Sequence, residues 1–194
     1  EKERIEFFEE FKNIIPENAK LVFKGEMFDV YQWEQELYDG SSATFEMLKR
    51  QDTAGTIAIV DNKIVILKDE QPHRGMTLTF PSGKVEPGED WLTGAKRELL
   101  EETGMAFADW KLIYVQNNIP RMEYSNLYYL AQNLTSRGEQ KPDPGEKIEV
   151  ILKDFDEVKK LCDDENEYVR FAKPVFDRVN SLEELVALPE YDSL

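Results

Sequence analysis

The chain has few of the residues on which many metal and redox sites are built. It contains one cysteine, Cys162, and one histidine, His73, among 194 residues. A single cysteine permits no disulfide within the chain and no zinc cluster made of several cysteines. This cysteine usage is typical of proteins in a reducing compartment, so we expect a cytoplasmic protein.

Positive charge is also scarce. Lys and Arg number 24 against 40 Asp and Glu, which gives a formal net charge of −16. Nucleic acids and most membrane surfaces are anionic, so neither is an expected partner. The sequence has no apolar run approaching the roughly 18–20 residues that span a bilayer. A small anionic ligand is still allowed, because bound cations can reverse the local field.

The hydrophobic content is high enough for a folded core. Hydrophobic residues make up 41% of the chain and include 11 Phe, 8 Tyr and 3 Trp. We expect an N-terminal helix with Ile5, Phe8, Phe11 and Ile15 at helical spacing, followed by two or three antiparallel strands within 20–50. The length and these patterns predict two domains, 1–52 and 53–194.

The second predicted domain mixes strands and helices. A hairpin spans 53–70 around the turn Asp61-Asn62-Lys63, and short strands are expected at 76–80, 110–119, 126–134 and 148–153. A helix is expected from Trp91 to Thr103, with Gly104 just past its end. Further helical segments cover 154–164 and 165–188, with a break near Pro174. Because strict βαβ alternation is absent, the pattern indicates an α+β fold.

The segment 83–105, GKVEPGEDWLTGAKRELLEETGM, concentrates acidic residues on one helix. Glu98, Glu101 and Glu102 lie three and four residues apart, so they share a helical face and repel one another. A hard cation such as Mg²⁺ or Mn²⁺ takes oxygen ligands and would neutralise them. Gly83 allows close backbone approach, which could bring the carbonyl of Ser82 to the same ion.

A solvated acidic helix is the simpler alternative interpretation of this segment. It would not require Gly83, Glu89, Arg97 and Gly104 at their particular offsets. Arg97 is well placed to pair with Glu89 in the preceding loop. The spacing therefore favours a metal site over a solvated face.

These residues resemble the signature of the Nudix hydrolases. The similarity covers Gly83, Glu89, Arg97-Glu98-Leu99, Glu101-Glu102 and Gly104-Met105. It implies an α/β/α sandwich with a mixed sheet, here preceded by an N-terminal helix and an antiparallel β extension. It also implies metal-dependent hydrolysis of the diphosphate linkage in a nucleoside diphosphate joined to another group.

The resemblance implies a role for each of these residues. Glu98, Glu101 and Glu102 would be catalytic metal ligands for Mg²⁺, with Mn²⁺ as an alternative, and the Ser82 carbonyl would complete the set. Arg97 and Glu89 would orient the helix and its loop. Gly83 and Gly104 would be structural members of the same motif.

Three further features are similar to the ADP-ribose pyrophosphatase branch. Pro120 lies 16 residues after Gly104. The N-terminal β region resembles one that forms a dimer and a substrate pocket, so a homodimer is expected. The loop PDPGEKIEV resembles one that carries a general base; Glu146 fits that role best and Asp143 is the rival. Each feature also has a simpler interpretation. Pro120 could lie in an ordinary turn, the N-terminal β region could only stabilise the fold, and the acidic residue of the loop could be solvated.

The chain also departs from that branch. Leu78-Thr79-Phe80-Pro81 stands where the branch often has Trp-Glu-Leu-Pro, and Arg121 replaces a glycine after Pro120. The segment EQPHR only loosely matches a Gln-aromatic-Arg segment. Within it, Gln71 and Arg74 would face a phosphate or a ribose, or else lie in an ordinary surface loop. His73 is expected to be solvated.

The leading prediction is therefore hydrolysis of ADP-ribose or a related nucleotide sugar to a nucleoside monophosphate and a sugar phosphate. The substrate contacts would include Arg74 and Pro120. One alternative is a Nudix hydrolase for dinucleoside polyphosphates or nucleoside triphosphates. Another is a non-catalytic nucleotide-binding module, although such a module would be expected to have lost metal ligands.

Overall fold

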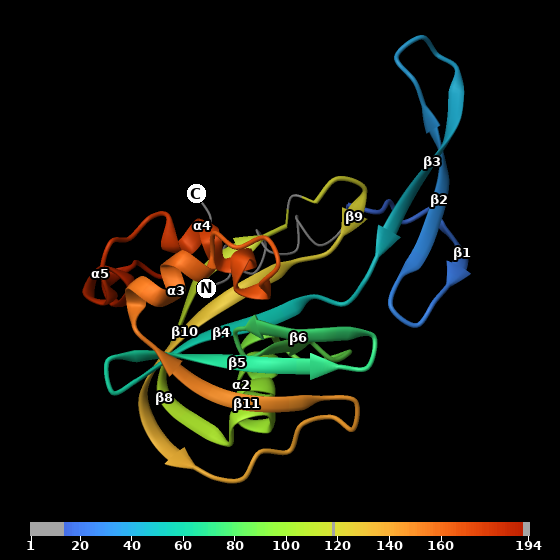
Figure 1. The fold of residues 1–194 in the computed structure, drawn as a ribbon. Helices are drawn as coiled ribbons and strands as arrows, with labels where there is room; N and C mark the ends of the chain where they lie inside the picture. The colour runs from blue at the N-terminus through green and yellow to red at the C-terminus, as the bar shows by residue number, and fades with distance from the viewer. Residues whose placement is uncertain (1–13, 118, 192–194) are drawn as a thin grey trace. The chain divides into compact units, whose positions relative to one another are not determined.

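The computed structural model describes residues 14–117 and 119–191, which divide into two compact units (Figure 1). Of the described residues, 14–52 and 115–126 belong to the first unit, and 53–114 and 127–191 belong to the second. Most of the expected N-terminal helix, including Ile5, Phe8 and Phe11, lies outside the described residues. The segment 115–126, which the sequence placed in the second domain, is part of the first unit.

The first unit is built on a four-stranded sheet in the order β1-β2-β3-β9. Its strands are β1 (Lys20–Lys24), β2 (Asp29–Glu36), β3 (Ser42–Lys49) and β9 (Met122–Glu123). β1, β2 and β3 are antiparallel neighbours, and β9 pairs with β3 in parallel. Figure 1 shows β2 and β3 side by side as a long ribbon. The prediction of two or three antiparallel strands in this region is confirmed.

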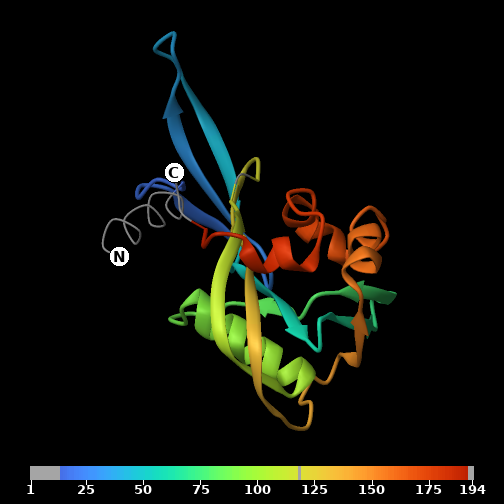
Figure 2. The same ribbon diagram turned by 90° about the vertical axis from the view of Figure 1, so that its left-hand side faces the viewer.

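The second unit is a mixed sheet with helices on both faces. The strand order is β11-β5-β4-β10-β8, with β6 paired to β5 and β7 paired to β4. The strands are β4 (Thr53–Val60), β5 (Lys63–Gln71), β6 (Arg74–Thr79), β7 (Ser82–Lys84), β8 (Met105–Gln116), β10 (Asn126–Arg137) and β11 (Lys147–Lys153). Helix α2 (Trp91–Thr103) lies on one face, and α3 (Phe155–Leu161), η1 (Tyr168–Ala172), α4 (Lys173–Phe176) and α5 (Leu182–Ala187) lie on the other (Figure 2).

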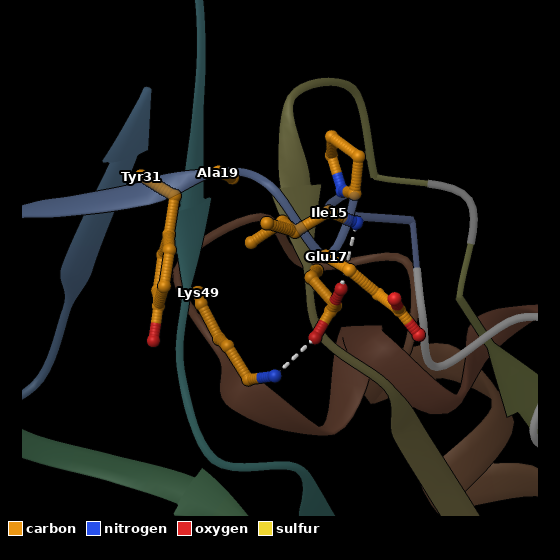
Figure 3. Close-up of a pocket in the computed structure, with 7 residues that line it drawn as sticks. Ile15, Glu17, Ala19, Tyr31 and Lys49 are labelled. Atoms are coloured by element: carbon orange, nitrogen blue, oxygen red, sulfur yellow. Dashed lines mark hydrogen bonds and ion pairs between the residues drawn. The ribbon is translucent and has the colours of Figure 1, made fainter. Parts of the chain in front are cut away.

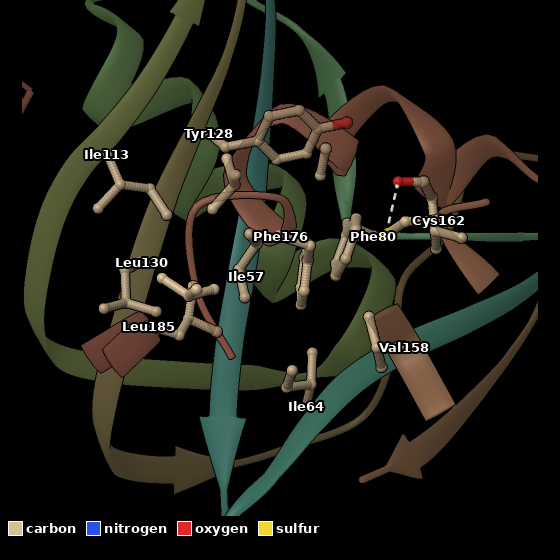
Figure 4. Packing of buried hydrophobic residues seen from close by; sticks show 14 of the residues in the cluster. Ile57, Ile64, Phe80, Ile113, Tyr128, Leu130, Val158, Cys162, Phe176 and Leu185 are labelled. Carbon is tan, nitrogen blue, oxygen red and sulfur yellow. Dashed lines mark hydrogen bonds between the residues drawn. The ribbon is translucent and has the colours of Figure 1, made fainter. Parts of the chain in front are cut away.

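Alternating apolar residues of the central strands supply a core on each face of this sheet. On β4, Ile57 packs with Phe80, Phe176 and other residues under the C-terminal helices (Figure 4). Ala58, the next residue, packs instead with the α2 residue Leu99. Burying apolar area on both faces fixes the register of the strands, because a shift of one residue would exchange the two faces. The predicted α+β sandwich is confirmed.

Three local predictions need correction. Asp61 and Asn62 alone form the hairpin turn, with φ of 52° and 59°, and Lys63 already pairs with Val60. β8 begins at Met105 rather than near 110, because the left-handed Gly104 redirects the chain directly from helix to strand. The final helical region is divided into short pieces, and Pro174 occupies the first turn of α4, where its missing N–H costs nothing.

Among the described residues, no helix is long and apolar enough to cross a bilayer.

Candidate active site

Helix α2 presents its acidic residues from a well-capped position. The Asp90 side chain accepts a hydrogen bond from the Thr93 backbone N–H at 2.9 Å, which satisfies a free donor at the start of the helix. Gly104, with φ of 69°, closes the other end and donates its N–H to the Leu100 carbonyl. Leu99 is fully buried and fixes the helix against the sheet. The helix bounds agree with the prediction of 91–103.

Arg97 joins the helix to the loop that precedes it. Its Nε and Nη2 donate to the two oxygens of Glu89 at 3.0 and 2.9 Å, and Nη2 also donates to the Lys84 carbonyl at 2.9 Å. These hydrogen bonds hold the pKa of Glu89 below its usual range and raise the pKa of Arg97. The pairing of Arg97 with Glu89 that the spacing predicts is therefore present, and it ties the loop to α2.

The same guanidinium contacts two of the predicted metal ligands. Arg97 Nη1 lies 2.7 Å from Glu98 Oε1 and 3.2 Å from Glu101 Oε2. Burial raises the pKa of Glu98, although Arg97 opposes this shift. Glu101 is more open, with 43% of its side chain exposed against 17% for Glu98. Both carboxylates thus have one cation as a shared neighbour.

Glu102 is the buried member of the acidic face. It is 6% exposed, and its Oε2 accepts a hydrogen bond from the Ser82 backbone N–H at 2.9 Å. Burial raises its pKa well above the ordinary value, and the negative charges of Glu98, Glu146 and Asp69 add to the shift. The contact brings the backbone of Ser82 to the helix face, where the sequence predicts a carbonyl ligand.

The donor types fit a hard divalent cation, but the side chains do not converge on one point. Within 14–117 and 119–191, no group of three or more His, Cys, Asp or Glu side chains is arranged to hold a metal. The reason is visible in the contacts: Glu98 and Glu101 turn to Arg97, while Glu102 turns to Ser82 N–H. Burial is the main cause of the raised pKa values of Glu98 and Glu102, and repulsion between neighbouring carboxylates adds to it; a bound cation would favour the ionised form of both.

Glu146 is brought toward this cluster by the loop before β11. It is among the charges that raise the pKa values of Glu98 and Glu102. Burial raises its own pKa, and Asp69 and Asp143 add to that shift by repulsion. The rival acid, Asp143, lies in the same loop, where its backbone N–H is 3.3 Å from Glu146 Oε2.

Arg74 is held by several contacts at the start of β6. Its Nη2 forms an ion pair with Asp69 Oδ2, and its Nη1 donates to Thr77 Oγ1 at 2.7 Å. The guanidinium also lies 4.4 Å from the centre of the Tyr168 ring, a cation–π contact. Its contact with a substrate stays a prediction. His73 beside it is exposed, as expected.

Pro120 belongs to the first unit, in the turn between β8 and β9. Arg121, which stands where the branch has a glycine, has φ of 59°. This is the left-handed region that glycine adopts freely and that a long side chain adopts at a cost. The turn therefore keeps the conformation suited to glycine, and the role of Pro120 in substrate binding stays a prediction.

The first unit also contains a cavity of about 560 Å³ (Figure 3). Ile15, Glu17, Tyr31 and Lys49 are among the residues that line it, and Lys49 forms an ion pair with the buried Glu123. Glu123 also accepts a hydrogen bond from the Ile15 backbone N–H at 3.0 Å. Its charge is therefore satisfied within the protein, and none of the predicted site residues lines the cavity.

Sequence reasoning missed Asp69. It lies on β5, is 5% exposed, and has one carboxylate oxygen, Oδ1, that has no hydrogen-bond partner among the described residues. A buried carboxylate with an unpaired oxygen is costly and is usually retained for a reason. The signal in the sequence was a charged residue in phase with Val65 and Leu67 on the buried side of an apolar strand.

Comparisons with known proteins identify the family of this chain. Residues 49–175 match the NUDIX domain family. The "ADP-ribose pyrophosphatase" of Bacillus subtilis (strain 168) is 28% identical over 151 residues, covering 76% of this chain and 82% of that protein. The "Methanol dehydrogenase activator" of Bacillus methanolicus is 33% identical over 88 residues, covering 44% of this chain and 48% of that protein.

A solved structure with the same fold extends the comparison. The crystal structure of an "ADP compounds hydrolase" superposes with a TM-score of 0.69 at 21% identity, covering 88% of this chain and 93% of that one. Because the family match spans more than half of the chain, and includes the α2 motif, the protein belongs to the Nudix family and is a hydrolase similar to ADP-ribose pyrophosphatases.

Proposed function

We propose that the protein hydrolyses the diphosphate linkage of ADP-ribose or a related nucleotide sugar, giving a nucleoside monophosphate and a sugar phosphate. The observation that carries this proposal is the acidic face of α2. There the partly buried Glu98 and the buried Glu102 have raised pKa values, and Glu102 accepts a hydrogen bond from the Ser82 backbone N–H. Similarity to an ADP-ribose pyrophosphatase over most of that protein's length supports the substrate class.

The proposed cofactor is Mg²⁺, with Mn²⁺ as an alternative. Glu98, Glu101 and Glu102 would hold it, together with the Ser82 carbonyl. A bound divalent ion would neutralise phosphoryl oxygens and lower the pKa of a water molecule. Arg97 keeps α2 and its loop in one arrangement, which is the positioning that phosphoryl chemistry depends on.

Glu146 is the proposed general base, and Asp143 is the alternative. A base is most effective when its pKa approaches the working pH. Burial moves the pKa of Glu146 in that direction. Its place in a loop between β10 and β11 would allow it to approach a water molecule after substrate binds.

We also propose a homodimer formed through the first unit. β1 is an edge strand whose five residues are all exposed, including Leu21, Val22 and Phe23. An exposed apolar edge favours pairing with another chain. A second copy of the unit would cover it. The expected location of the protein remains the cytoplasm.

The test is a panel of nucleotides incubated with Mg²⁺, with products identified by mass. We expect ADP-ribose or a nucleotide sugar to give a monophosphate and a sugar phosphate. Faster turnover of triphosphates or dinucleoside polyphosphates would overturn the substrate class. Binding without turnover of any compound would favour the non-catalytic alternative. Performing the reaction in ¹⁸O-labelled water would identify the phosphorus that is attacked.

A further inference from the structure

The side-chain amide of Gln71 lies between two carboxylates from distant parts of the chain. Its Nε2 is 3.1 Å from Asp69 Oδ2 and 3.5 Å from Glu146 Oε1. An amide nitrogen carries two hydrogens, so it can donate one to each carboxylate. Gln71 and Glu146 are 75 residues apart in sequence, and the contact connects the end of β5 to the loop before β11.

The side chain of Gln71 is itself held in place by its contact with Asp69. Asp69, its partner, is buried and forms an ion pair with Arg74. Arg74 is fixed in turn by Thr77 Oγ1 and by the ring of Tyr168. The amide of Gln71 therefore projects from a rigid support, whereas the loop that carries Glu146 contains Pro142, Pro144 and Gly145 and no regular structure.

Among the described residues, the carboxylate of Glu146 is held only by long hydrogen bonds, whereas its backbone N–H donates to the Asp143 carbonyl at 2.9 Å. Its Oε1 has the 3.5 Å contact with Gln71, and its Oε2 has the 3.3 Å contact with Asp143 N–H. Hydrogen bonds at such distances are weak, which suits a carboxylate that must adjust to a substrate. Glu146 interacts electrostatically with four carboxylates and one cation. The carboxylates are Asp69, Asp143, Glu98 and Glu102, and the cation is Arg74.

We propose that Gln71 is a positioning residue that holds the Glu146 carboxylate at the acidic site, and that Asp69 and Arg74 hold Gln71. The inference rests on the proposed function of Glu146 as general base. Four negative groups repel Glu146, and without the amide donor its carboxylate would turn toward solvent. A neutral amide is suited to this place because it donates to both carboxylates without adding a charge that would immobilise Glu146.

The test compares two substitutions at this position. Gln71→Leu removes both hydrogen bonds, and we expect kcat to fall about 10-fold while KM changes about 2-fold or less, since a misplaced base weakens chemistry more than binding. The acid limb of the pH–rate profile should move to higher pH, because the lost donor favoured the ionised form. Gln71→Arg keeps a donor and adds a cation, so the limb should move to lower pH.

Shifts of the acid limb in opposite directions in Gln71→Leu and Gln71→Arg would indicate a positioning role. A purely structural role would lower the activity of both variants without moving the acid limb in opposite directions. Lys68→Met is the matched control, since Lys68 precedes Asp69 on β5 and its ammonium group forms an ion pair with the exposed Glu149. If Gln71→Leu fails to fold, Gln71→Asn replaces it, because its shorter amide cannot reach Glu146 and should give the same shift.

The outcomes separate this inference from the proposed function. A wild-type protein that hydrolyses no compound of the panel overturns both. A wild-type enzyme that loses activity with Glu146→Gln, but whose rate and acid limb are unchanged by Gln71→Leu, overturns the positioning role alone. An active enzyme unaffected by Glu146→Gln overturns the role of Glu146 and with it that of Gln71.

Discussion

The backbone of Gly83 lies directly against the carboxylate of Glu98. A Cβ added at position 83 would overlap the Cδ atom and both carboxylate oxygens of Glu98. Gly83 does not have the positive φ that marks Gly88 and Gly104. The glycine is therefore required here for space and not for backbone conformation, and its absent side chain is what lets β7 and α2 bring a carboxylate and a main chain together.

We predict that Gly83→Ala impairs activity more than folding. The atoms in the way belong to the end of a flexible side chain, so Glu98 can move aside while β7 stays in place. Displacing a proposed metal ligand should lower kcat/KM at least about 10-fold, since misplacement of about 1 Å can cost up to about 100-fold. The melting temperature should change little.

Gly75→Ala is the matched control for this substitution. Beyond its two chain neighbours, an added Cβ at position 75 would meet no atom of the described residues within 4 Å. It should leave both the rate and the melting temperature close to wild type. Full activity of Gly83→Ala would show that the position of Glu98 against β7 does not matter for the reaction.

The acidic residues themselves give a second prediction. Glu101→Gln and Glu102→Gln should each reduce kcat at least ~100-fold, because each removes charge from the proposed metal site. Glu86→Gln, in the exposed loop before α2, is the control and should have little effect. Turnover like that of the wild type in both Glu101 and Glu102 variants would refute the assignment of the metal ligands.

A third prediction concerns metal and pH. Burial raises the pKa values of Glu98 and Glu102, so their favourable contribution to stability is present below the unfolded carboxyl pKa of about 4.3 and is lost as pH rises through their folded values. Near neutral pH these two carboxylates should therefore destabilise the metal-free protein. Mg²⁺ should restore stability by binding the folded state.

Thermal unfolding in the presence of Mg²⁺ or of EDTA tests the direction of these effects on stability. We expect Mg²⁺ to raise the melting temperature near neutral pH and to have a smaller effect in mild acid. Glu102→Gln should unfold at a higher temperature than wild type in EDTA and gain less from Mg²⁺. A Glu102→Gln variant that is less stable than wild type in EDTA near neutral pH would contradict the prediction.

The α2 motif was predictable from sequence because its contacts are local. Arg97 and Glu89 are eight residues apart, and helical spacing places Glu98, Glu101 and Glu102 on one face whatever the rest of the fold does. The directions of their side chains were not predictable, since Glu102 turns to Ser82 N–H through a contact made only when β7 packs against α2.

The surroundings of Glu146 depend on pairing between distant strands. The register in which Lys147 pairs with Glu70 brings the loop before β11 to the end of β5, where Gln71 lies. No local pattern encodes that register. The importance of Asp69 was not predictable for a similar reason. Its burial follows from the packing of the whole sheet, and its hydrogen-bond partner Gln71 and ion-pair partner Arg74 lie beyond the apolar run of the strand.

The fourth prediction is that the protein forms a homodimer through β1. Val22 is 49% exposed at the centre of this edge strand, and its neighbours Leu21 and Phe23 are exposed at 45% and 60%. We expect light scattering after size exclusion to give twice the mass of one chain. Val22→Asp should shift the protein to a single-chain mass, because a carboxylate buried in an apolar contact without a partner is unfavourable.

Leu100→Asp is the control for the dimer. Leu100 is equally exposed, at 49%, but lies on α2 in the second unit. It should leave the mass of the wild type unchanged, because it adds the same charge outside the unit that contains β1. A wild-type protein with the mass of one chain at all concentrations would refute the dimer. If Leu100→Asp abolished the dimer and Val22→Asp did not, the interface would have to be assigned to the second unit and not to β1.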